Sequence, residues 1–315
     1  MALRVPPPAI ATTTDEKGRM ENGRMKFWQS TAFNDPAELP EIARCAEQCG
    51  FEGILVSEHL FVPGAYEPAY LYSESGRPDF DTTTPFPDPW VTIATMAAAT
   101  TRLRFCTLVY ILPLHHPLEV AKSLATLALY SDDRVMLGAG AGWMREEFEA
   151  LGVDFRSRGR RFDEMIEVMR KLWKGGLVEH RGEFFEFAPL AQSPAPARPI
   201  PIGIGGASKP ALRRAARLGD GWLGAGNTPE QAEEILRTLD RLRAEAGRSE
   251  EPFESIVPLT VPPEADTLRR LSELGADGTV NYPFRYTVGT DATLQQKLDA
   301  MREYGERVIA PMRDL

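Results

Sequence analysis

The feature of this sequence that most restricts its fold is a repeated alternation of short apolar segments and amphipathic helices. The apolar segments lack polar alternation, as in LRFCTLVYIL, which indicates parallel strands covered by helices on both faces. The predicted strands are residues 25–33, 53–59, 103–112, 134–142, 199–206, 221–226, 253–261 and 277–284, and a helix follows each. Eight such units predict an α/β fold, the closed (β/α)8 TIM barrel. The alternative is an open doubly wound sheet, which usually has fewer units.

Two segments interrupt the repeat. A long loop, residues 60–87, follows the second strand, and residues 174–198 form an insertion before the fifth strand that is typical of a hairpin with a proline-rich return. We expect residues 25–315 to form one barrel domain. Residues 1–24 contain three consecutive prolines and no apolar stretch of the length found in export signals, so we expect a disordered or loosely packed tail. Packing of this tail on a neighbour is the alternative.

Composition narrows the class of protein. The 36 basic and 45 acidic residues give a net charge of −9, which argues against nucleic-acid binding and against a polybasic membrane surface. No apolar run approaches the ~20 residues of a membrane helix. Cys45 and Cys49 lie one helical turn apart and are expected to share a helix face; with Cys106 they cannot form a disulfide framework. We therefore predict a cytoplasmic protein that acts on a small molecule.

Catalytic groups of such a barrel lie at the carboxyl ends of its strands. Glu58 and His59 end the second predicted strand, and an imidazole there can exchange a proton with a ring nitrogen or a substrate oxygen. A structural, fully bonded histidine is the alternative. The other strand ends are Thr107–Tyr110, Gly138–Trp143, Gly203–Ser208, Gly224–Thr228 and Asn281–Pro283.

Glycines gather at three of these strand ends. Glycine lets a backbone approach a bulky ligand, and free amides at a following helix can hold a phosphate. Each pair alone would also fit a tight turn, but three clusters on one rim favour a phosphate-bearing planar cofactor. Metal chemistry is not expected, because the chain has only four histidines. Of these, His115 and His116 are expected to cap a helix, and His180 to be solvated in the insertion.

The sequence resembles a known family. Residues 103–173 are similar to the bacterial luciferase-like monooxygenase superfamily, above all to the branch that uses the deazaflavin coenzyme F420. The segments GILVSEHLF (53–61) and PIPIGIGGASKPALRRAARLGDGW (199–222) are similar as well. The resemblance implies coenzyme F420 as the cofactor, with FMN as the alternative because FMN-using members share the barrel.

The resemblance also implies roles for particular residues. Glu58 and His59 match an acidic–histidine pair in which the histidine lies against the cofactor, so both are predicted to be catalytic. A cis peptide that backs the ring is expected near Leu108–Val109. The residues predicted to bind the cofactor are Thr107, Leu108, Val109, Gly140, Gly142, Gly205, Gly206, Ala207 and Ser208. The family's catalytic glutamate on sugar phosphates would fall near Ala141, where this chain has no carboxylate, which argues against glucose-6-phosphate as substrate.

The loop 60–87 is expected to cover the same mouth, because it follows the strand that carries His59. Its aromatic residues are Phe61, Tyr66, Tyr70, Tyr72, Phe80 and Phe86. They suit an apolar or aromatic substrate; packing of the loop, or a subunit interface, is the alternative. We predict substrate contacts from Tyr66, Tyr110 and Trp143, and a homodimer. The predicted function is hydride transfer between coenzyme F420 and an organic substrate. An FMN-dependent monooxygenase and a non-catalytic flavin-binding barrel are the alternatives.

Overall fold

The computed structural model describes residues 24–67, 70 and 75–312, and within them the strands form a closed parallel barrel. The sheet order runs β3-β2-β1-β11-β10-β9-β8-β5, and β5 pairs with β3 to close it, which confirms the barrel and excludes the open sheet. The barrel strands are β1 (Lys26–Ser30), β2 (Gly53–Val56), β3 (Arg104–Thr107), β5 (Val135–Gly140), β8 (Ile202–Gly205), β9 (Gly221–Leu223), β10 (Glu254–Val257) and β11 (Gly278–Asn281).

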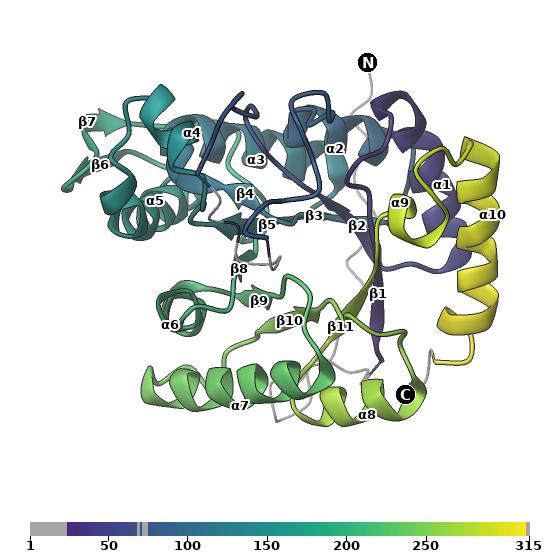
Figure 1. Ribbon diagram of the computed structural model, residues 1–315. Helices are drawn as coiled ribbons and strands as arrows, with labels where there is room; N and C mark the ends of the chain where they lie inside the picture. The colour runs from purple at the N-terminus through teal and green to yellow at the C-terminus, as the bar shows by residue number, and fades with distance from the viewer. Residues whose placement is uncertain (1–23, 68–69, 71–74, 313–315) are drawn as a thin grey trace, which may run out of the picture.

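Helices surround the strands (Figure 1). They are α1 (Leu39–Cys49), α2 (Pro89–Ala98), α3 (Pro117–Ser131), α4 (Arg145–Ala150), α5 (Arg158–Trp173), α6 (Lys209–Leu218), α7 (Pro229–Glu245), α8 (Ala265–Glu273), α9 (Phe284–Thr287) and α10 (Leu294–Tyr304), with single turns η1 (Pro36–Glu38), η2 (Leu112–Leu114), η3 (Phe155–Ser157) and η4 (Gly305–Ile309). Several helices begin with a side-chain cap, and His116 caps α3 as predicted. The same expectation for His115 is wrong, because its ring contacts Glu58 instead. No helix of the described residues is long and apolar enough to cross a membrane.

The third predicted strand is interrupted. The peptide bond between Leu108 and Val109 is cis, which confirms the expectation, and the chain resumes pairing only as β4 (Tyr110–Ile111), beside β5. A side chain at Gly140 or at Gly205 would meet Val109 at 2.5 Å. These two glycines therefore leave room for the Val109 side chain at the strand ends.

The insertion is a hairpin of β6 (Val178–Arg181) and β7 (Glu186–Leu190), as predicted. Glu164 of α5 fastens it, because its carboxylate accepts hydrogen bonds from the amides of residues 183, 184 and 185. The expectation that His180 is solvated is wrong. Its side chain is buried, and Nε2 lies 3.1 Å from Glu164 Oε1, because the hairpin folds down onto α5.

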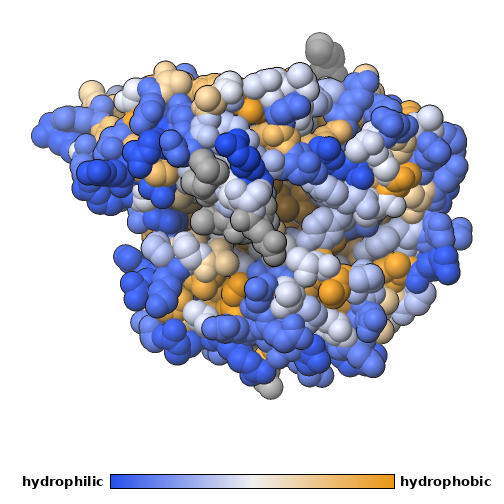
Figure 2. All heavy atoms as spheres, in the orientation of Figure 1, coloured by the Kyte–Doolittle hydropathy of each residue, from blue (hydrophilic) through white to orange (hydrophobic). Residues whose placement is uncertain are grey.

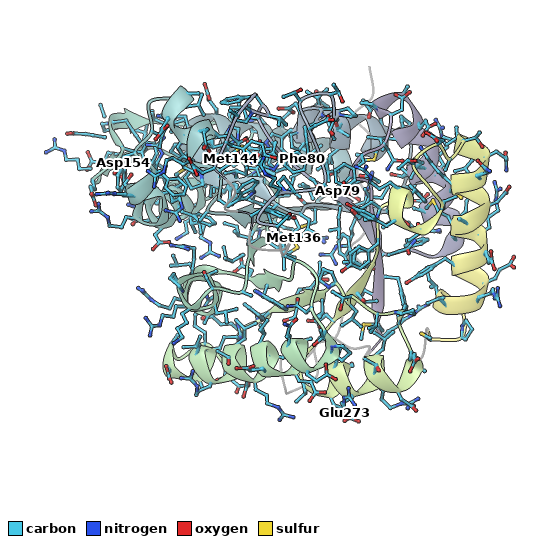
Figure 3. All side chains as sticks on the ribbon, viewed as in Figure 1. Asp79, Phe80, Met136, Met144, Asp154 and Glu273 are labelled. Atoms are coloured by element: carbon cyan, nitrogen blue, oxygen red, sulfur yellow. The ribbon has the colours of Figure 1, made fainter. Side chains whose placement is uncertain are left out.

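Ion pairs close the barrel at the end where its strands begin. Arg104 donates to both carboxylate oxygens of Glu254 at 2.9 and 2.8 Å, and Lys26 donates to Glu254 at 2.7 Å. Above them, the barrel interior is apolar and is filled by Trp28, Leu55, Cys106, Met136, Leu223, Ile256 and Val280; Figure 3 labels Met136 in the middle of the barrel. This end of the barrel is therefore closed by paired charges, and apolar side chains pack above them.

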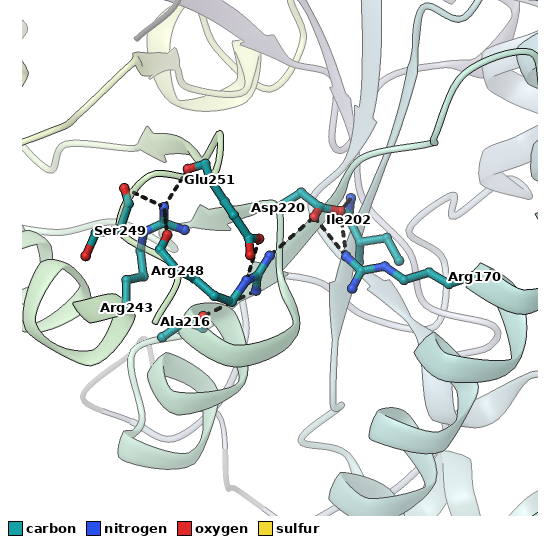
Figure 4. A network of polar contacts seen from close by, with 8 residues as sticks. All are labelled: Arg170, Ile202, Ala216, Asp220, Arg243, Arg248, Ser249 and Glu251. Atoms are coloured by element: carbon teal, nitrogen blue, oxygen red, sulfur yellow. Dashed lines mark hydrogen bonds and ion pairs between the residues drawn. The ribbon is translucent and has the colours of Figure 1, made fainter. Parts of the chain in front are cut away.

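A second polar network joins outer elements near the same end (Figure 4). Asp220, just before β9, accepts hydrogen bonds from Arg170 of α5 at 2.7 Å and from the amide of Ile202 at 3.0 Å. Arg248 lies 3.7 Å from the other oxygen of Asp220 and pairs with Glu251 at 2.6 Å. The network fixes α5 and the segment after α7 against the base of the barrel.

Candidate active site

The site is built on parallel strands, whose carboxyl ends share one rim of the barrel. His59 follows β2 and lies under the long loop: its ring centroid is 4.7 Å from that of Phe80 and 5.0 Å from that of Phe86. Trp143, after β5, meets the same ring edge-on at 6.0 Å. The structure thus brings the predicted catalytic histidine together with the loop and with Trp143.

Glu147 is the charged partner of His59. Its Oε2 lies 3.2 Å from His59 Nδ1, and its Oε1 accepts the amide of Leu60 at 3.2 Å. The Glu147 side chain has no exposed surface, and His59 is 9% exposed. Burial of a carboxylate is costly unless such partners replace water. The contact between Glu147 and His59 is therefore an organised part of the rim.

Sequence reasoning missed Glu147, although a signal was present. Met144, Glu147 and Phe148 lie three and four residues apart and are all buried, so a carboxylate occupies the apolar face of α4. A charged residue in such a stripe needs a buried partner. The resemblance places a carboxylate near Ala141, and this chain has none there. The carboxylate that contacts His59 is Glu147, in the first turn of α4.

Glu58 points away from the His59 ring. Its Oε2 accepts the amide of Ile111 at 2.5 Å, and its Oε1 lies 2.8 Å from Nε2 of His115. The ring of Tyr110 stacks on His115 at 4.2 Å. Glu58 therefore binds β4 and the segment after it to the end of β2.

The predicted substrate residues separate into two groups. Tyr66 and Tyr70 of the loop lie 6.0 and 5.1 Å from Trp143, so Tyr66 and Trp143 belong to the aromatic cluster over His59. Tyr110 does not: it is 3% exposed and packs between Trp90 and His115. Burial raises the pKa of its phenol. Tyr72 lies outside the described residues.

The loop is fastened to the opposite side of the mouth. Asp79, labelled with Phe80 in Figure 3, accepts a hydrogen bond from the hydroxyl of Tyr286 at 3.1 Å, and its carbonyl accepts one from Arg285 at 2.9 Å. Burial and the bond to Asp79 raise the pKa of Tyr286 to about 12. A second tie joins the amide of Glu67 to Glu146 of α4 at 2.8 Å. Figure 2 shows a hollow with hydrophobic residues at its base in the middle of this face.

The predicted cofactor residues differ in what they offer a ligand. Thr107 is fully buried and exchanges two hydrogen bonds with Gly138 of β5, while Gly140 and Gly205 accommodate Val109. Gly142 has a φ of 79°, and a side chain there would meet Ile111 and Phe148. These four residues therefore belong to the packed backbone behind the rim.

The remaining positions leave surface for a ligand. Leu108 and Val109 are half-buried at the mouth, above the barrel interior. Gly206 has a φ of 102°, which favours glycine, and Ala207 and Ser208 after it are exposed. Ser208 caps α6, so the amides at the start of that helix lie beside an open loop. This arrangement fits a planar ring against residues 108–109 with a phosphate near 206–208. No group of three or more metal-ligating side chains occurs among the described residues.

Comparison with known proteins assigns the family. The model for luciferase-like monooxygenases matches residues 10–307. The chain belongs to the luciferase-like monooxygenase family. An uncharacterized protein of Mycobacterium tuberculosis is 36% identical over 288 residues, which cover 91% of this chain and 99% of the relative. Members of this family are oxidoreductases, so the chain is an enzyme of that class.

Two further luciferase-like proteins are informative. The F420-dependent hydroxymycolic acid dehydrogenase of Mycobacterium tuberculosis is 32% identical over 185 residues, which cover 58% of this chain and 47% of that protein. The crystal structure of the monooxygenase RslO1 from Streptomyces bottropensis superposes with a TM-score of 0.71 at 21% identity, covering 91% of this chain and 99% of that one. The second likeness shows that the two chains share the barrel fold.

Proposed function

We propose that the protein is an oxidoreductase that transfers a hydride between coenzyme F420 and an apolar or aromatic organic substrate. The observation that carries this proposal is His59, held by a buried carboxylate at the carboxyl rim of the barrel and covered by the aromatic side chains of the loop 60–87. The similarity to an F420-dependent dehydrogenase supports the choice of cofactor.

The residues that would hold the cofactor are those with open surface at the rim. Leu108 and Val109 would back the ring, and Gly206, Ala207 and Ser208 would receive the phosphate at the start of α6. When bound, coenzyme F420 supplies a carbon that accepts or donates a hydride. The protein supplies orientation, exclusion of water and a proton partner.

His59 is the proton partner in this proposal. Its Nδ1 is bound to Glu147, and Nε2 has no hydrogen-bond partner among the described residues, so Nε2 is the nitrogen that exchanges a proton with the substrate. Glu58, predicted from the sequence to be catalytic, is proposed instead to hold β4 through the amide of Ile111. Its effect on the reaction would pass through the position of residues 108–111.

The aromatic cluster supports the proposed substrate class. Phe80, Phe86 and Trp143 contact the His59 ring, and Tyr66 packs on Trp143. The loop that carries the tyrosine and both phenylalanines is tied to α4 and to α9. Such a cover excludes water from a hydride donor and offers flat apolar surface to a substrate.

The second candidate is an FMN-dependent monooxygenase; RslO1, which shares the barrel fold, is itself a monooxygenase. A flavin-binding barrel without catalysis is a third. Titration of the purified protein with coenzyme F420 and with FMN separates the first two candidates by the cofactor that binds. Oxygen consumption separates them again, because the deazaflavin reacts poorly with oxygen. Anaerobic hydride exchange from reduced F420 to aromatic carbonyl compounds supports the proposal. Tight FMN binding with oxygen consumption would replace it, and binding without turnover would indicate the third.

We also propose that the chain forms a homodimer through α2. That helix carries no charged residue, and Val91 on its outer face is 66% exposed; Leu129 and Tyr130 at the end of the neighbouring α3 are 64% and 78% exposed. An uncharged, exposed face of this kind suits a second copy of the same chain. Light scattering of the wild type and of Val91→Glu tests it: the proposal requires a dimer that the substitution dissociates.

A further inference from the structure

The contact between Glu147 and His59 differs from the other acidic contacts at the rim. The neighbouring carboxylates are turned elsewhere: Glu58 to His115, Glu146 to the amide of Glu67, and Asp79 to Arg285 and Tyr286. Glu147, from α4, is the ionisable group that touches the His59 ring among the described residues. Rings of the loop and of Trp143 form the rest of that contact.

The two oxygens of Glu147 have different partners, and this fixes the chemistry of the ring. Oε1 receives the amide N–H of Leu60, and Oε2 faces Nδ1 of His59. In its ionised form the Glu147 carboxylate only accepts hydrogen bonds, and the proton of this contact is then on Nδ1. In the neutral ring, Nε2 is then the unprotonated nitrogen, able to accept a proton from a substrate and to return it.

We propose that Glu147 is the positioning residue of the reaction: it holds His59 in the Nδ1–H form and in the orientation that leaves Nε2 for the substrate. This inference rests on the proposed function for its effect on turnover, but not for the state of the ring. A carboxylate placed only to fasten the end of β2 to α4 would need the Leu60 amide alone. The second carboxylate oxygen, Oε2, contacts the imidazole, and this contact assigns the chemical role.

The substitution Glu147→Gln separates these two roles. The amide of Leu60 continues to require an acceptor, so the glutamine oxygen stays on that side and its NH2 group faces Nδ1. That NH2 group can only donate, which forces the proton of the neutral ring onto Nε2. The fastening of β2 to α4 is kept while the ring is reversed. Glu149→Gln, on the exposed side of α4, is the matched control.

The first measurement is the 15N spectrum of the histidine side chains, in the full-length protein and without substrate. The chain has four histidines, so single replacements of the other three assign the signals of His59. The neutral ring is expected as Nδ1–H in the wild type and in Glu149→Gln, and as Nε2–H in Glu147→Gln. An Nε2–H ring in the wild type overturns the proposal even if the variant does not fold.

The second measurement is steady-state kinetics with F420. Glu147→Gln is expected to lower kcat about 10- to 100-fold with KM changed less than about twofold, because the binding surface is intact and the proton is on the wrong nitrogen. Unchanged kcat with a reversed ring would overturn the positioning role and leave the proposed function standing. Absence of any F420 turnover in the wild type would instead remove the proposed function, while the spectrum would still decide the state of His59.

Discussion

The two ends of the barrel use buried charge in opposite ways. Where the strands begin, Glu254 accepts hydrogen bonds from both Lys26 and Arg104, and the three side chains are half-buried. Where the strands end, His59 gives one nitrogen to Glu147 and keeps the other without a partner among the described residues. The Lys26–Arg104–Glu254 group, here called the plug, therefore stabilises the fold at the first end. The Nε2 of His59, which has no partner among the described residues, leaves the second end available for chemistry. The comparison predicts that substitutions at the two ends will separate stability from activity.

The largest effect is expected at the plug. Arg104→Met removes the bidentate partner of Glu254 and leaves a half-buried carboxylate with Lys26 alone. Breaking a fully buried pair costs about 3–5 kcal/mol of unfolding free energy, and we expect the lower end of that range, about 3 kcal/mol, because both side chains keep some exposed surface. Urea denaturation monitored by circular dichroism measures it, at a temperature where the variant is still folded. The affinity for the cofactor at the other end should be unchanged; a loss of that affinity in the folded variant would contradict the separation of the two ends.

Acid should weaken the same plug. Burial alone would raise the pKa of Glu254, but the hydrogen bonds and charge of Arg104, and then of Lys26, outweigh it and lower the pKa to about 2. A lowered pKa stabilises the fold above the unfolded value near 4.5, and this stability is lost as the pH falls from there through about 2. The contribution is about 3 kcal/mol. Denaturation of the wild type and of Glu254→Gln at pH 6 and pH 3 measures it: the difference between the two proteins should shrink at pH 3.

At the other end, His59→Asn should slow turnover ~10²-fold, or about 2.7 kcal/mol in the barrier, because the proton partner is lost. Cofactor affinity should change much less. His180→Asn is the matched control, since His180 also pairs with a glutamate, Glu164, but lies in the hairpin. It is expected to lower the melting temperature and to leave kcat as it is. Equal losses of kcat in the two variants would show that His59 acts through stability alone.

Much of this division could be predicted from the sequence, because it follows from local pattern and topology. Continuous apolar strands alternating with helices require a parallel barrel, and a parallel barrel places the residue after β2, His59, at the functional rim. The break at Leu108–Val109 came from the family resemblance and is confirmed. Whether Glu58, Tyr110 or His180 faces solvent could not be derived in this way.

Those errors and omissions share a physical cause. Glu147 meets His59 across 88 residues of sequence, and Glu58 meets His115 across 57, so no local periodicity encodes either pair. His180 is buried only because Glu164 binds the hairpin turn against α5. Contacts of this kind depend on how complete elements pack, which pattern and spacing do not determine.

The smallest effect is expected at the tie between the loop and α9. Tyr286→Phe removes the hydroxyl that donates to Asp79 and keeps the ring that packs on Phe33. One such hydrogen bond contributes about 0.5–1.5 kcal/mol, so the closed loop should lose that much relative to an open one. Since the loop covers the substrate and not the base of the barrel, KM should rise about 2- to 10-fold while kcat and the melting temperature change little.

Steady-state kinetics over a wide range of substrate concentration measures this effect, and Tyr130→Phe on the outer surface of α3 is the control for removal of a tyrosine hydroxyl. The direction of the change in kcat distinguishes two roles of this tie. If opening of the loop limits release of product, a weaker tie should raise kcat slightly as KM rises. If the tie instead orients Phe80 against His59, kcat should fall. A variant with wild-type KM and kcat would mean that the Asp79 contact does not hold the loop, and that the aromatic contacts with His59 and Trp143 are sufficient to keep it closed.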